Sequence, residues 1–420
     1  MRSTRAFASV CLLALTAGGC STSGDDGSTT GQVLTLAAAG QGPAEAAVKA
    51  FEKANPGVEV RTTYAQDDAS YQQQLRTQLS SGTAPDVFRM WPGGGSTMAV
   101  RDLAEDGMTM DLSGESWAPG MSADLKAVTS DSKGKVRAVP VTVGAIGAIW
   151  NDQALAKSGL EKPTTWSEVL AFCKDAKAKD VVPFALGLKS SWVAQLLPYS
   201  LASSLVYGPD PDFTQKQKDG KATFAKSAWK EAVGKQLEMR DAGCFNDSPN
   251  GVGYDEQMQM LGQGKALGAV HVISAVESAR TSAPQGTTFS MTAFPATDQA
   301  DSTYLPVSVG ITYGVNAKAK NPALAKKFMA FLASPEGQNL YATESGSSPA
   351  LSSPSFKPDA LQQPVLKALE TQKSTLYPDQ SWPNAKVQQE HLTSTQELFN
   401  KTINVATLLD RMDEAFGETR

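Results

Sequence analysis

The sequence predicts an α/β protein built as two lobes, and three observations lead to this fold class. First, residues 32–91 read strand, helix, strand, helix, strand, an order that gives a parallel sheet covered by helices. Second, a chain of 420 residues is too long for one compact hydrophobic core. Third, residues 134–151, GKVRAVPVTVGAIGAIWN, are extended and punctuated by glycine, as expected of a segment that crosses between lobes.

Local patterns predict the elements of residues 32–91. They are a strand at 33–37, a helix opened by Pro43 with Val48 and Phe51 inward, a strand at 58–62, a helix with Tyr71, Leu75 and Leu79 four residues apart, and a third strand at 86–91. Ligands collect beyond the carboxyl ends of the strands in such sheets. We therefore expect residues 39–41, residues 64–68 and Trp91 to share one rim.

The rest of the chain continues the mixed pattern. A short helix runs to Gly159, and Thr165 with Glu168 forms a capping box that starts the next helix. The later elements are a strand at 181–188, helices near 190–201, 229–237 and 255–261, a strand at 266–272, a helix from 274, extended runs at 288–296 and 306–316, and helices from Pro322 to the end of the chain.

The N-terminus reads as a secretory leader. Arg2 and Arg5 precede the uncharged apolar run 6–17, which is shorter than the roughly 20 residues that span a bilayer as a helix. Residues 1–19 resemble a bacterial lipoprotein signal, which implies that Cys20 is the lipidation site, although Ala17 stands where such signals usually carry Leu. Residues 20–31, rich in Ser, Thr, Gly and Asp, then form a flexible tether. The alternative is an ordinary secretory leader with Cys20 incidental.

Two further cysteines fit a secreted, disulfide-permissive setting. Cys173 shares the buried face of a predicted helix, and Cys244 follows Gly243 at a predicted helix end. We expect a structural disulfide between Cys173 and Cys244, with two free buried thiols as the alternative. The chain contains only two histidines, which argues against a histidine-rich metal site. No metal and no cofactor are expected.

Composition and motifs exclude several function classes. The formal net charge is −5 and no basic cluster occurs, which argues against a nucleic-acid partner. The run GQGKAL has Ala266 where a P-loop needs Ser or Thr, and no GxSxG or HExxH motif appears. The adjacent carboxylates Asp67 and Asp68 could in principle serve a glycosidase, but neighbouring acids in a polar loop are usually solvated. The sequence therefore favours a protein that is not an enzyme.

The tryptophans favour a carbohydrate ligand. The chain has seven, and most stand at segment ends or turns. Indole faces pack well on the C–H faces of sugar rings, while nearby polar groups bond the hydroxyls. Trp166 and Trp229 stand in helical register with apolar partners and are expected in the core. We expect the ligand contacts among the indoles to be Trp91, Trp150, Trp192 and Trp382.

Six runs of the sequence match, in order and spacing, landmarks of a known family. They are FEKANPGVEV, YQQQLRTQLSSGTAPDVFRMW, GKVRAVP, IWNDQALAKSGLEKPTTWSEVL, GQGKALGAV and AKKFMAFLASPEGQNLYATESGSSPA. The chain thus resembles the extracellular solute-binding proteins of family 1, which serve sugar-type ABC importers. The resemblance implies a periplasmic binding protein type II-like fold, in which two α/β lobes joined by a hinge close on a ligand in an interlobe cleft.

The resemblance also implies lobe boundaries. Residues 32–140 and 273–330 are expected to form the N-terminal lobe. Residues 141–272 and 331–420 are expected to form the C-terminal lobe, which includes the C-terminal helices.

The same resemblance implies which side chains face the cleft. Carried over position by position, they are Gln41, Asp67, Asp68, Trp91, Trp150, Asn151, His271, Ser274, Tyr313 and Ser347. His271 stands beside apolar strand residues, and such a lone histidine is more often a satisfied structural group than a ligand contact.

The sequence therefore predicts a monomeric lipoprotein on the outer face of the cell membrane. It would capture a sugar or oligosaccharide and deliver it to the permease subunits of an ABC importer. Two alternatives stay open. One is a binding protein for a polyamine, a peptide or an aromatic osmolyte, since Asp67 and Asp68 could face a cation. The other is a secreted enzyme that acts on polysaccharides.

Overall fold

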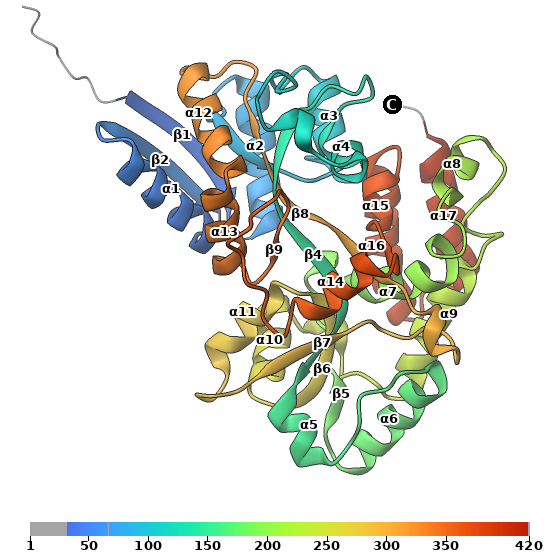
Figure 1. The fold of residues 1–420 in the computed structure, drawn as a ribbon. Helices are drawn as coiled ribbons and strands as arrows, with labels where there is room; N and C mark the ends of the chain where they lie inside the picture. The colour runs from blue at the N-terminus through green and yellow to red at the C-terminus, as the bar shows by residue number, and fades with distance from the viewer. Residues whose placement is uncertain (1–31, 66, 419–420) are drawn as a thin grey trace, which may run out of the picture.

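The computed structural model describes residues 32–65 and 67–418. Within these ranges the chain forms two lobes, each with its own strands and covering helices (Figure 1). The predicted leader 1–19, the tether 20–31 and the predicted lipidation site Cys20 lie outside the described residues. No helix among the described residues is both long enough and apolar enough to cross a bilayer.

The first lobe is built on a sheet in which β1 pairs in parallel with β2 on one side and β3 on the other. This arrangement confirms the predicted order of strands and helices. Its elements are β1 (Gln32–Ala39), α1 (Gly42–Ala54), β2 (Val58–Ala65), α2 (Asp68–Ser81), β3 (Val87–Met90), α3 (Val100–Glu105), η1 (Ala118–Gly120), α4 (Ala123–Thr129), α12 (Pro322–Ala333), α13 (Pro335–Glu344) and β9 (Ser348–Pro349).

Two long strands connect the lobes. β4 (Ala138–Asn151) pairs antiparallel with β8 (Leu305–Val315) over residues 138–145, and with β6 and β7 over residues 146–151. One strand therefore contributes to both sheets, and Figure 1 shows it running from one half of the molecule into the other. The glycine-punctuated run read from the sequence is this crossing strand.

The second lobe is built around β5, β6 and β7. Helices that include α9, α16 and α17 form a layer beside these strands (Figure 1). Its elements are α5 (Asp152–Ser158), α6 (Trp166–Ala178), β5 (Val182–Phe184), η2 (Ser191–Gln195), α7 (Leu196–Ala202), η3 (Ser203–Tyr207), α8 (Phe213–Lys218), α9 (Trp229–Asp241), η4 (Pro249–Gly251), α10 (Tyr254–Gly262), β6 (Ala266–Val272), α11 (Ala275–Ser282), β7 (Phe289–Thr292), η5 (Ala300–Ser302), α14 (Gln363–Glu370), β10 (Ser374–Thr375), α15 (Pro378–Ser381), α16 (Ala385–Phe399) and α17 (Val405–Gly417).

The packing differs from the predicted lobe boundaries in two places. Residues 275–292 pack with β6 in the second lobe, because β7 pairs with the second half of β4. Residues 331–349 return to the first lobe, where Leu332 and Tyr341 share a core with Leu34 and Phe51. The chain crosses back at β8 and not near residue 273, so both boundaries drawn at 273 and 331 are corrected.

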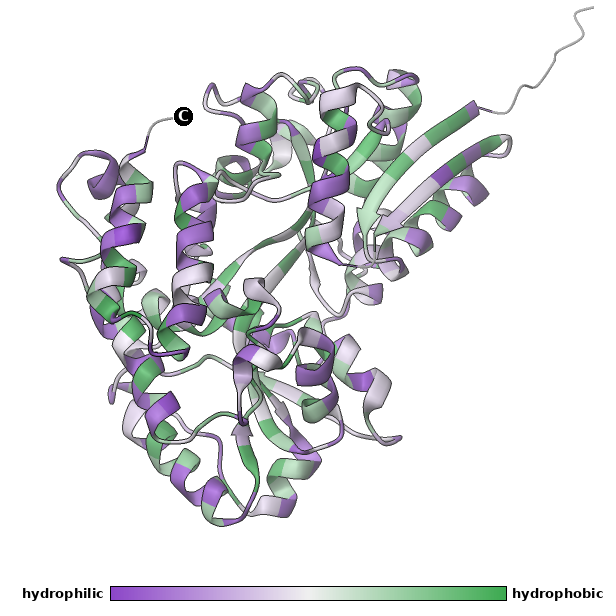
Figure 2. Cartoon of the chain, turned by 180° about the vertical axis from the view of Figure 1, so that it is seen from behind, coloured by the Kyte–Doolittle hydropathy of each residue, from purple (hydrophilic) through white to green (hydrophobic). Residues whose placement is uncertain are grey.

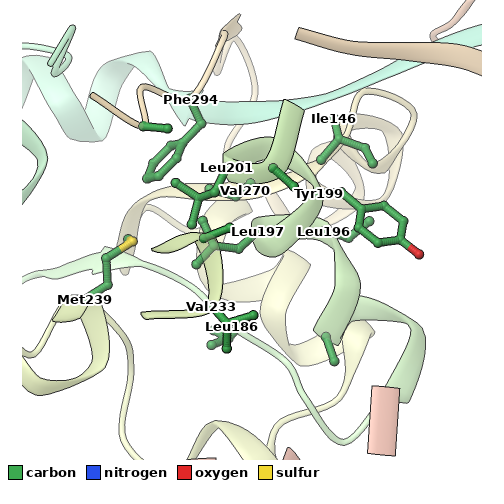
Figure 3. Packing of buried hydrophobic residues seen from close by; sticks show 14 of the residues in the cluster. Ile146, Leu186, Leu196, Leu197, Tyr199, Leu201, Val233, Met239, Val270 and Phe294 are labelled. Atoms are coloured by element: carbon green, nitrogen blue, oxygen red, sulfur yellow. The ribbon is translucent and has the colours of Figure 1, made fainter. Parts of the chain in front are cut away.

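The second lobe holds the larger set of buried aromatic and aliphatic side chains. Figure 3 shows Leu196, Leu197 and Leu201 of α7 packed with side chains from α9 and the strands, among them Val233 and Val270. Figure 2 shows that hydrophobic residues concentrate in the strands, whereas the helices carry hydrophilic residues as well. Burial of these apolar faces stabilises the fold at roughly 25 cal/mol per Å² removed from water.

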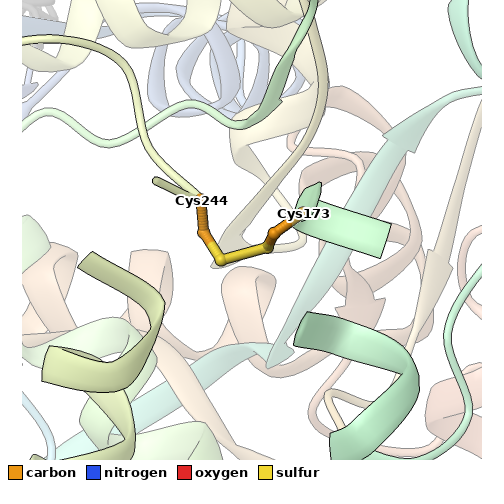
Figure 4. The surroundings of a disulfide bond; sticks show 2 residues. All are labelled: Cys173 and Cys244. Atoms are coloured by element: carbon orange, nitrogen blue, oxygen red, sulfur yellow. A yellow bond between two sulfur atoms is a disulfide. The ribbon is translucent and has the colours of Figure 1, made fainter. Parts of the chain in front are cut away.

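The predicted disulfide is present. Cys173 of α6 bonds to Cys244, which follows α9, with 4.9 Å between their Cα atoms (Figure 4). Both cysteines are fully buried in the core of the second lobe. The bond closes a loop of sequence separation 71 and so restricts the unfolded chain.

Replacing both cysteines, Cys173→Ala with Cys244→Ala, should lower the free energy of unfolding by about 2–4 kcal/mol, because the unfolded chain regains loop entropy. Urea unfolding monitored by circular dichroism measures the change. Reductant should destabilise the parent protein by a similar amount and leave the double variant unaffected. Equal stability of parent and variant would contradict a structural role for the bond.

A cluster of aromatic rings surrounds His391 in the second lobe. Its imidazole stacks on Tyr199 at 5.6 Å and meets Trp229 and Trp382 at their faces or edges. Neither ring nitrogen has a hydrogen-bond partner among the described residues. Burial lowers the pKa of His391 to about 3, so the folded protein holds this side chain neutral.

A depressed histidine pKa makes stability depend on pH. The unfolded chain takes up a proton on His391 below about pH 6.5, whereas the folded protein does not, so stability is lost as pH falls. His391→Phe should therefore reduce the loss of unfolding free energy between pH 7.5 and pH 5 by about 2 kcal/mol. Urea titrations at both pH values test this, and an unchanged pH dependence would show that His391 is protonated in the folded state.

Candidate functional site

Trp91 follows β3 at its carboxyl end and is partly exposed. The guanidinium carbon of Arg89 lies 4.5 Å from the centre of the indole ring, and the ring of Tyr71 lies 5.9 Å away. The Tyr71 hydroxyl donates a hydrogen bond to the Arg89 carbonyl at 2.9 Å, which fixes α2 against β3. A cation–π contact therefore orients the indole at the strand end.

Arg89 is held in turn by Asp68. Its Nη1 donates to Asp68 Oδ1 at 2.8 Å, and its side chain is only 14% exposed. Burial, the largest single effect, acts to lower the pKa of Arg89, but the charge of Asp68 and the hydroxyls of Tyr313, Tyr341 and Tyr71 together outweigh it, and the pKa is raised. Asp68 begins α2, where the helix dipole favours a negative charge.

A second partly exposed indole, Trp192, lies on η2 of the second lobe. Its ring is 5.3 Å from Tyr254 and 5.1 Å from His271, and those two rings are 5.3 Å apart. The Tyr254 hydroxyl donates to Ser278 Oγ at 2.8 Å. The three rings form one aromatic wall.

A charge interaction links this wall to the first lobe. Burial, followed by the charges of Asp255 and Asp68, raises the pKa of the Tyr254 hydroxyl, while its bond to Ser278 lowers it. Asp68 belongs to the first lobe and Tyr254 to the second. The charge of Asp68 therefore acts across the space between the lobes on the Tyr254 hydroxyl.

Three polar side chains continue from Trp192 on the second lobe. Gln388 Nε2 donates to Gln195 Oε1 at 2.9 Å and to Asp379 Oδ2 at 3.1 Å. Gln195 lies three residues after Trp192 on the same 3₁₀-helix, so the two share a face. Burial raises the pKa of Asp379 to about 7, and its own backbone N–H and Tyr199 partly oppose the rise.

The glycine loop after Trp91 packs directly on α15. A Cβ atom built on Gly93 would lie 2.1 Å from the Gln380 carbonyl oxygen, and one on Gly95 would lie 2.0 Å from that of Asp379. α15 is itself anchored, because Gln380 Nε2 donates to the Val309 carbonyl at 3.0 Å on β8. Only glycine permits this approach of first-lobe backbone to second-lobe backbone.

These contacts, together with the longer-range charge interaction of Asp68 with Tyr254, link the lobes at two places. We call this set of residues the contact ring, and its members are Trp91, Arg89, Asp68, Tyr254, Trp192, Gln195, Gln388, Asp379 and Gly95. The ring joins two partly exposed indoles, one from each lobe, with amide and carboxylate groups between them.

Comparison with known proteins agrees with this architecture. The sequence profile of the bacterial extracellular solute-binding protein family matches residues 35–339, well over half of the chain.

The chain belongs to this family.

Membership makes it a solute-binding protein and not an enzyme. The chain is 23% identical over 375 residues to the multiple sugar-binding protein of Streptococcus mutans. The match covers 88% of this chain and 86% of that protein.

Solved structures show the same fold. One, from work on xylan utilization by Caldanaerobius polysaccharolyticus, superposes with a TM-score of 0.79 at 20% identity, covering 91% of this chain and 99% of that one. A sugar transporter from Bacillus licheniformis in complex with stachyose has a TM-score of 0.71 at 20% identity, covering 91% and 98%. The two-lobed α/β fold predicted from the sequence is thereby confirmed.

The structure does not bring all the predicted indoles to the contact ring. Trp150 and Trp382 are fully buried, so the expectation that they touch the ligand is wrong. Trp150 donates from Nε1 to Thr292 Oγ1 at 2.9 Å within the sheet of the second lobe. Trp382 lies 6.2 Å from Trp229 and anchors the end of α15 in the core.

Three polar predictions are also corrected by burial. Asn151 is 3% exposed and caps α5, while its Nδ2 donates to the Leu261 carbonyl at 2.9 Å. Tyr313 is 1% exposed, and its hydroxyl bonds that of Tyr341 at 2.9 Å. Ser347 is buried, with Oγ 3.4 Å from the Ser345 carbonyl. All three side chains are thus buried and bonded within the protein.

The remaining predicted residues differ in exposure. Asp67 caps α2 by accepting from Ser70, whose bonds lower the pKa of the Asp67 carboxyl. Gln41 is exposed and donates to Glu45 Oε2 at 2.7 Å, and Ser274 is partly exposed before α11. His271 is fully buried behind Trp192, and burial lowers its pKa to about 3. It packs against the Trp192 ring as the buried member of the wall.

Sequence reasoning missed Arg89, Tyr254, Gln195, Gln388 and Asp379. Arg89 lies within β3 and Gln388 within α16. In the sequence, a polar residue inside a strand or helix is usually assigned to the solvent-facing side. The one available signal was Gln195, three residues after Trp192 in a polar break of an apolar run. Their convergence depends on tertiary contacts between segments far apart in the chain.

A cavity of about 430 Å³ lies elsewhere, on the surface of the second lobe. It is lined by η3, α8 and the loop before α9, and Phe213, Lys216 and Lys226 are among its lining residues. It contains no member of the contact ring. Within residues 32–65 and 67–418, no three His, Cys, Asp or Glu side chains come together as a metal site.

Gly95→Ala should destabilise the folded protein by about 1–3 kcal/mol, because a methyl group would overlap the Asp379 carbonyl and displace the loop from α15. Gly114→Ala is the matched control, since a Cβ there meets nothing within 4 Å. Thermal unfolding of both variants measures the effect. Equal stability of the two would show that the loop does not rest on α15.

Proposed function

We propose that this protein captures a sugar or oligosaccharide at the contact ring and delivers it to the permease of an ABC importer. The observation that carries the proposal is the pair of partly exposed indoles, Trp91 from the first lobe and Trp192 from the second, both in the contact ring. Family membership and the sugar-binding names of the relatives support it.

The chemistry of the ring suits a neutral polyol. Indole rings present apolar faces for the C–H groups of a sugar ring, and Trp192 is backed by His271 and Tyr254, which hold it in place. Amide and carboxylate groups lie along the same wall and can bond hydroxyls. One of the two faces of Trp91 is covered by Arg89, so Trp192 is the more open platform.

The polyamine alternative has less support. A cationic ligand would need free carboxylates beside the indoles. Asp67 accepts two hydrogen bonds from Ser70 at 2.8 Å, and Asp68 is paired with Arg89 at 2.8 Å. Both acids that the sequence analysis offered for a cation are therefore engaged within the first lobe.

Transport requires closure and release, and no covalent chemistry. A ligand that contacts both lobes favours the closed arrangement by the difference in its affinity for the two states. We propose that residues 1–19 are removed as a leader and that Cys20 is lipidated. The tether 20–31 then holds the lobes at the outer face of the cell membrane, near the permease.

Thermal-shift screening of neutral mono- and oligosaccharides identifies the ligand, because a sugar at 100 times its Kd adds about 2.7 kcal/mol to the stability of the folded state. Trp192→Ala should then weaken binding at least tenfold in calorimetry, and Trp91→Ala should weaken it less, since Arg89 covers one indole face. Both variants should stay folded.

Trp117→Ala is the control, because Trp117 is a partly buried indole that packs on the first-lobe core outside the contact ring. Its affinity should equal that of the parent. Unchanged affinity in both Trp91→Ala and Trp192→Ala would place the site elsewhere. A panel in which no sugar shifts the melting temperature would refute the proposed ligand class.

A further inference from the structure

Arg101 and Lys218 come from opposite lobes to the end of α15. Arg101 belongs to α3 of the first lobe, and its Nη1 donates to the Trp382 carbonyl at 3.4 Å. On the second lobe, the hydroxyls of Thr214 and Ser381 are 2.9 Å apart, which joins α8 to α15. Lys218 lies four residues after Thr214, on the same face of α8. Both cations are therefore placed beside residues 381 and 382.

The Arg101 side chain is held in a narrow space. A Cβ atom built on Gly94 would lie 2.4 Å from Arg101 Nη1 and 2.9 Å from the Trp382 carbonyl oxygen. The guanidinium group thus lies between the glycine loop of the first lobe and the end of α15. It makes no other hydrogen bond within the described residues, so most of its five N–H donors remain available.

Neither cation forms an ion pair within residues 32–65 and 67–418. Burial, followed by the charge of Arg101, lowers the pKa of the Lys218 ammonium group, and no acidic side chain contributes to that shift. The neighbouring acids are engaged. Asp219 is paired with another lysine at 3.1 Å, and Asp102 and Glu105 of α3 make contacts of their own. Two like charges therefore face each other from the two lobes, and like charges at short range repel.

A buried amide without a partner lies on the same face of α8. Gln217 stands three residues after Thr214 and directly before Lys218, and it is 6% exposed. Neither its Nε2 nor its Oε1 has a hydrogen-bond partner among the described residues. A buried amide left unpaired is unfavourable, and an ion bound beside it supplies a partner for its NH₂ group.

The three side chains together suit a compact oxyanion. A guanidinium group binds such anions through two parallel N–H donors, and an ammonium group adds up to three further donors. The amide of Gln217 offers a neutral donor beside them. Sulfate and phosphate carry several acceptor oxygens on one small ion, so a single ion can accept from both lobes at once.

We propose that Arg101, Lys218 and Gln217 form an oxyanion site that bridges the two lobes. A bound sulfate or phosphate neutralises the facing cations and adds a link between α3 and α8. This link favours the arrangement in which the lobes meet at α15, since the anion contacts both lobes only there. The site is separate from sugar capture.

Calorimetry with sodium sulfate and with sodium phosphate, at constant ionic strength, measures the Kd of each anion. The variants are Arg101→Gln, Lys218→Gln and the double variant. The controls, Arg76→Gln on α2 and Lys230→Gln on α9, each remove an exposed cation that forms no ion pair within the described part of the chain. Sulfate also stabilises folded proteins in general by exclusion from their surface, and the controls set this baseline.

The parent and both controls should bind each anion with equal affinity. Each single variant should bind at least tenfold more weakly, because a charge-assisted contact is lost. The double variant should lose little beyond either single variant, since removing one end already breaks the bridge.

Thermal unfolding gives a readout that a merely structural contact would not produce. Without an oxyanion and at low ionic strength, Lys218→Gln should melt at or above the temperature of the parent, because the two like charges no longer oppose each other. At a saturating sulfate concentration the order should reverse, since only the parent gains the bridging ion.

The outcomes decide the proposal without reference to sugars. Absence of saturable anion binding by the parent would overturn it, as would equal affinity in the parent and both single variants. Loss of binding in only one of the two would show a site on a single lobe and refute the bridge. If Lys218→Gln melts below the parent by the same margin with and without sulfate, the lysine has a structural role and the proposal is wrong. A sugar screen without a ligand would refute the proposed function and change none of these results.

Discussion

The arrangement of the two lobes depends on the backbone hydrogen bonds of β4. Its first half completes the sheet of the first lobe through β8, and its second half completes that of the second lobe through β6 and β7. The register with β8 shifts between Pro140 and Val143, and such irregularities bend a strand and increase its twist. The relative position of the lobes, and hence of the two partly exposed indoles, thus depends on the bend of β4 and on its pairing with β8.

The second constraint is a backbone contact between the lobes, away from β4. Gly93 and Gly95 let the first lobe rest on α15, and α15 is held by β8 and by the buried indole of Trp382. The lobes therefore touch in two places of different character. One is a shared hydrogen-bonded strand, and the other is a close approach that any side chain would prevent.

Local patterns predicted most of the fold and less of the site. Apolar period and caps located β1, α1, α2 and the capping box of α6, because neighbours in sequence decide those features. Trp150 and Trp192 both stand near apolar runs in the sequence. Their different burial follows from the fold, because Trp150 lies in the buried strand β4 and Trp192 lies on η2. Gln195 and Gln388 are 193 residues apart, so no local pattern announces their bond. The lobe boundaries failed for the same reason, since strand pairing decides them.

The distribution of indoles has a consequence for optical work on this molecule. Trp150, Trp229 and Trp382 are all sealed inside the second lobe, and Trp166 is nearly so. Their emission will be blue-shifted and constant whatever occupies the opening. The change in tryptophan fluorescence on ligand binding should therefore be small against a large constant emission. Replacing the buried tryptophans by phenylalanine, or attaching a fluorescent dye near η2, would increase the relative change.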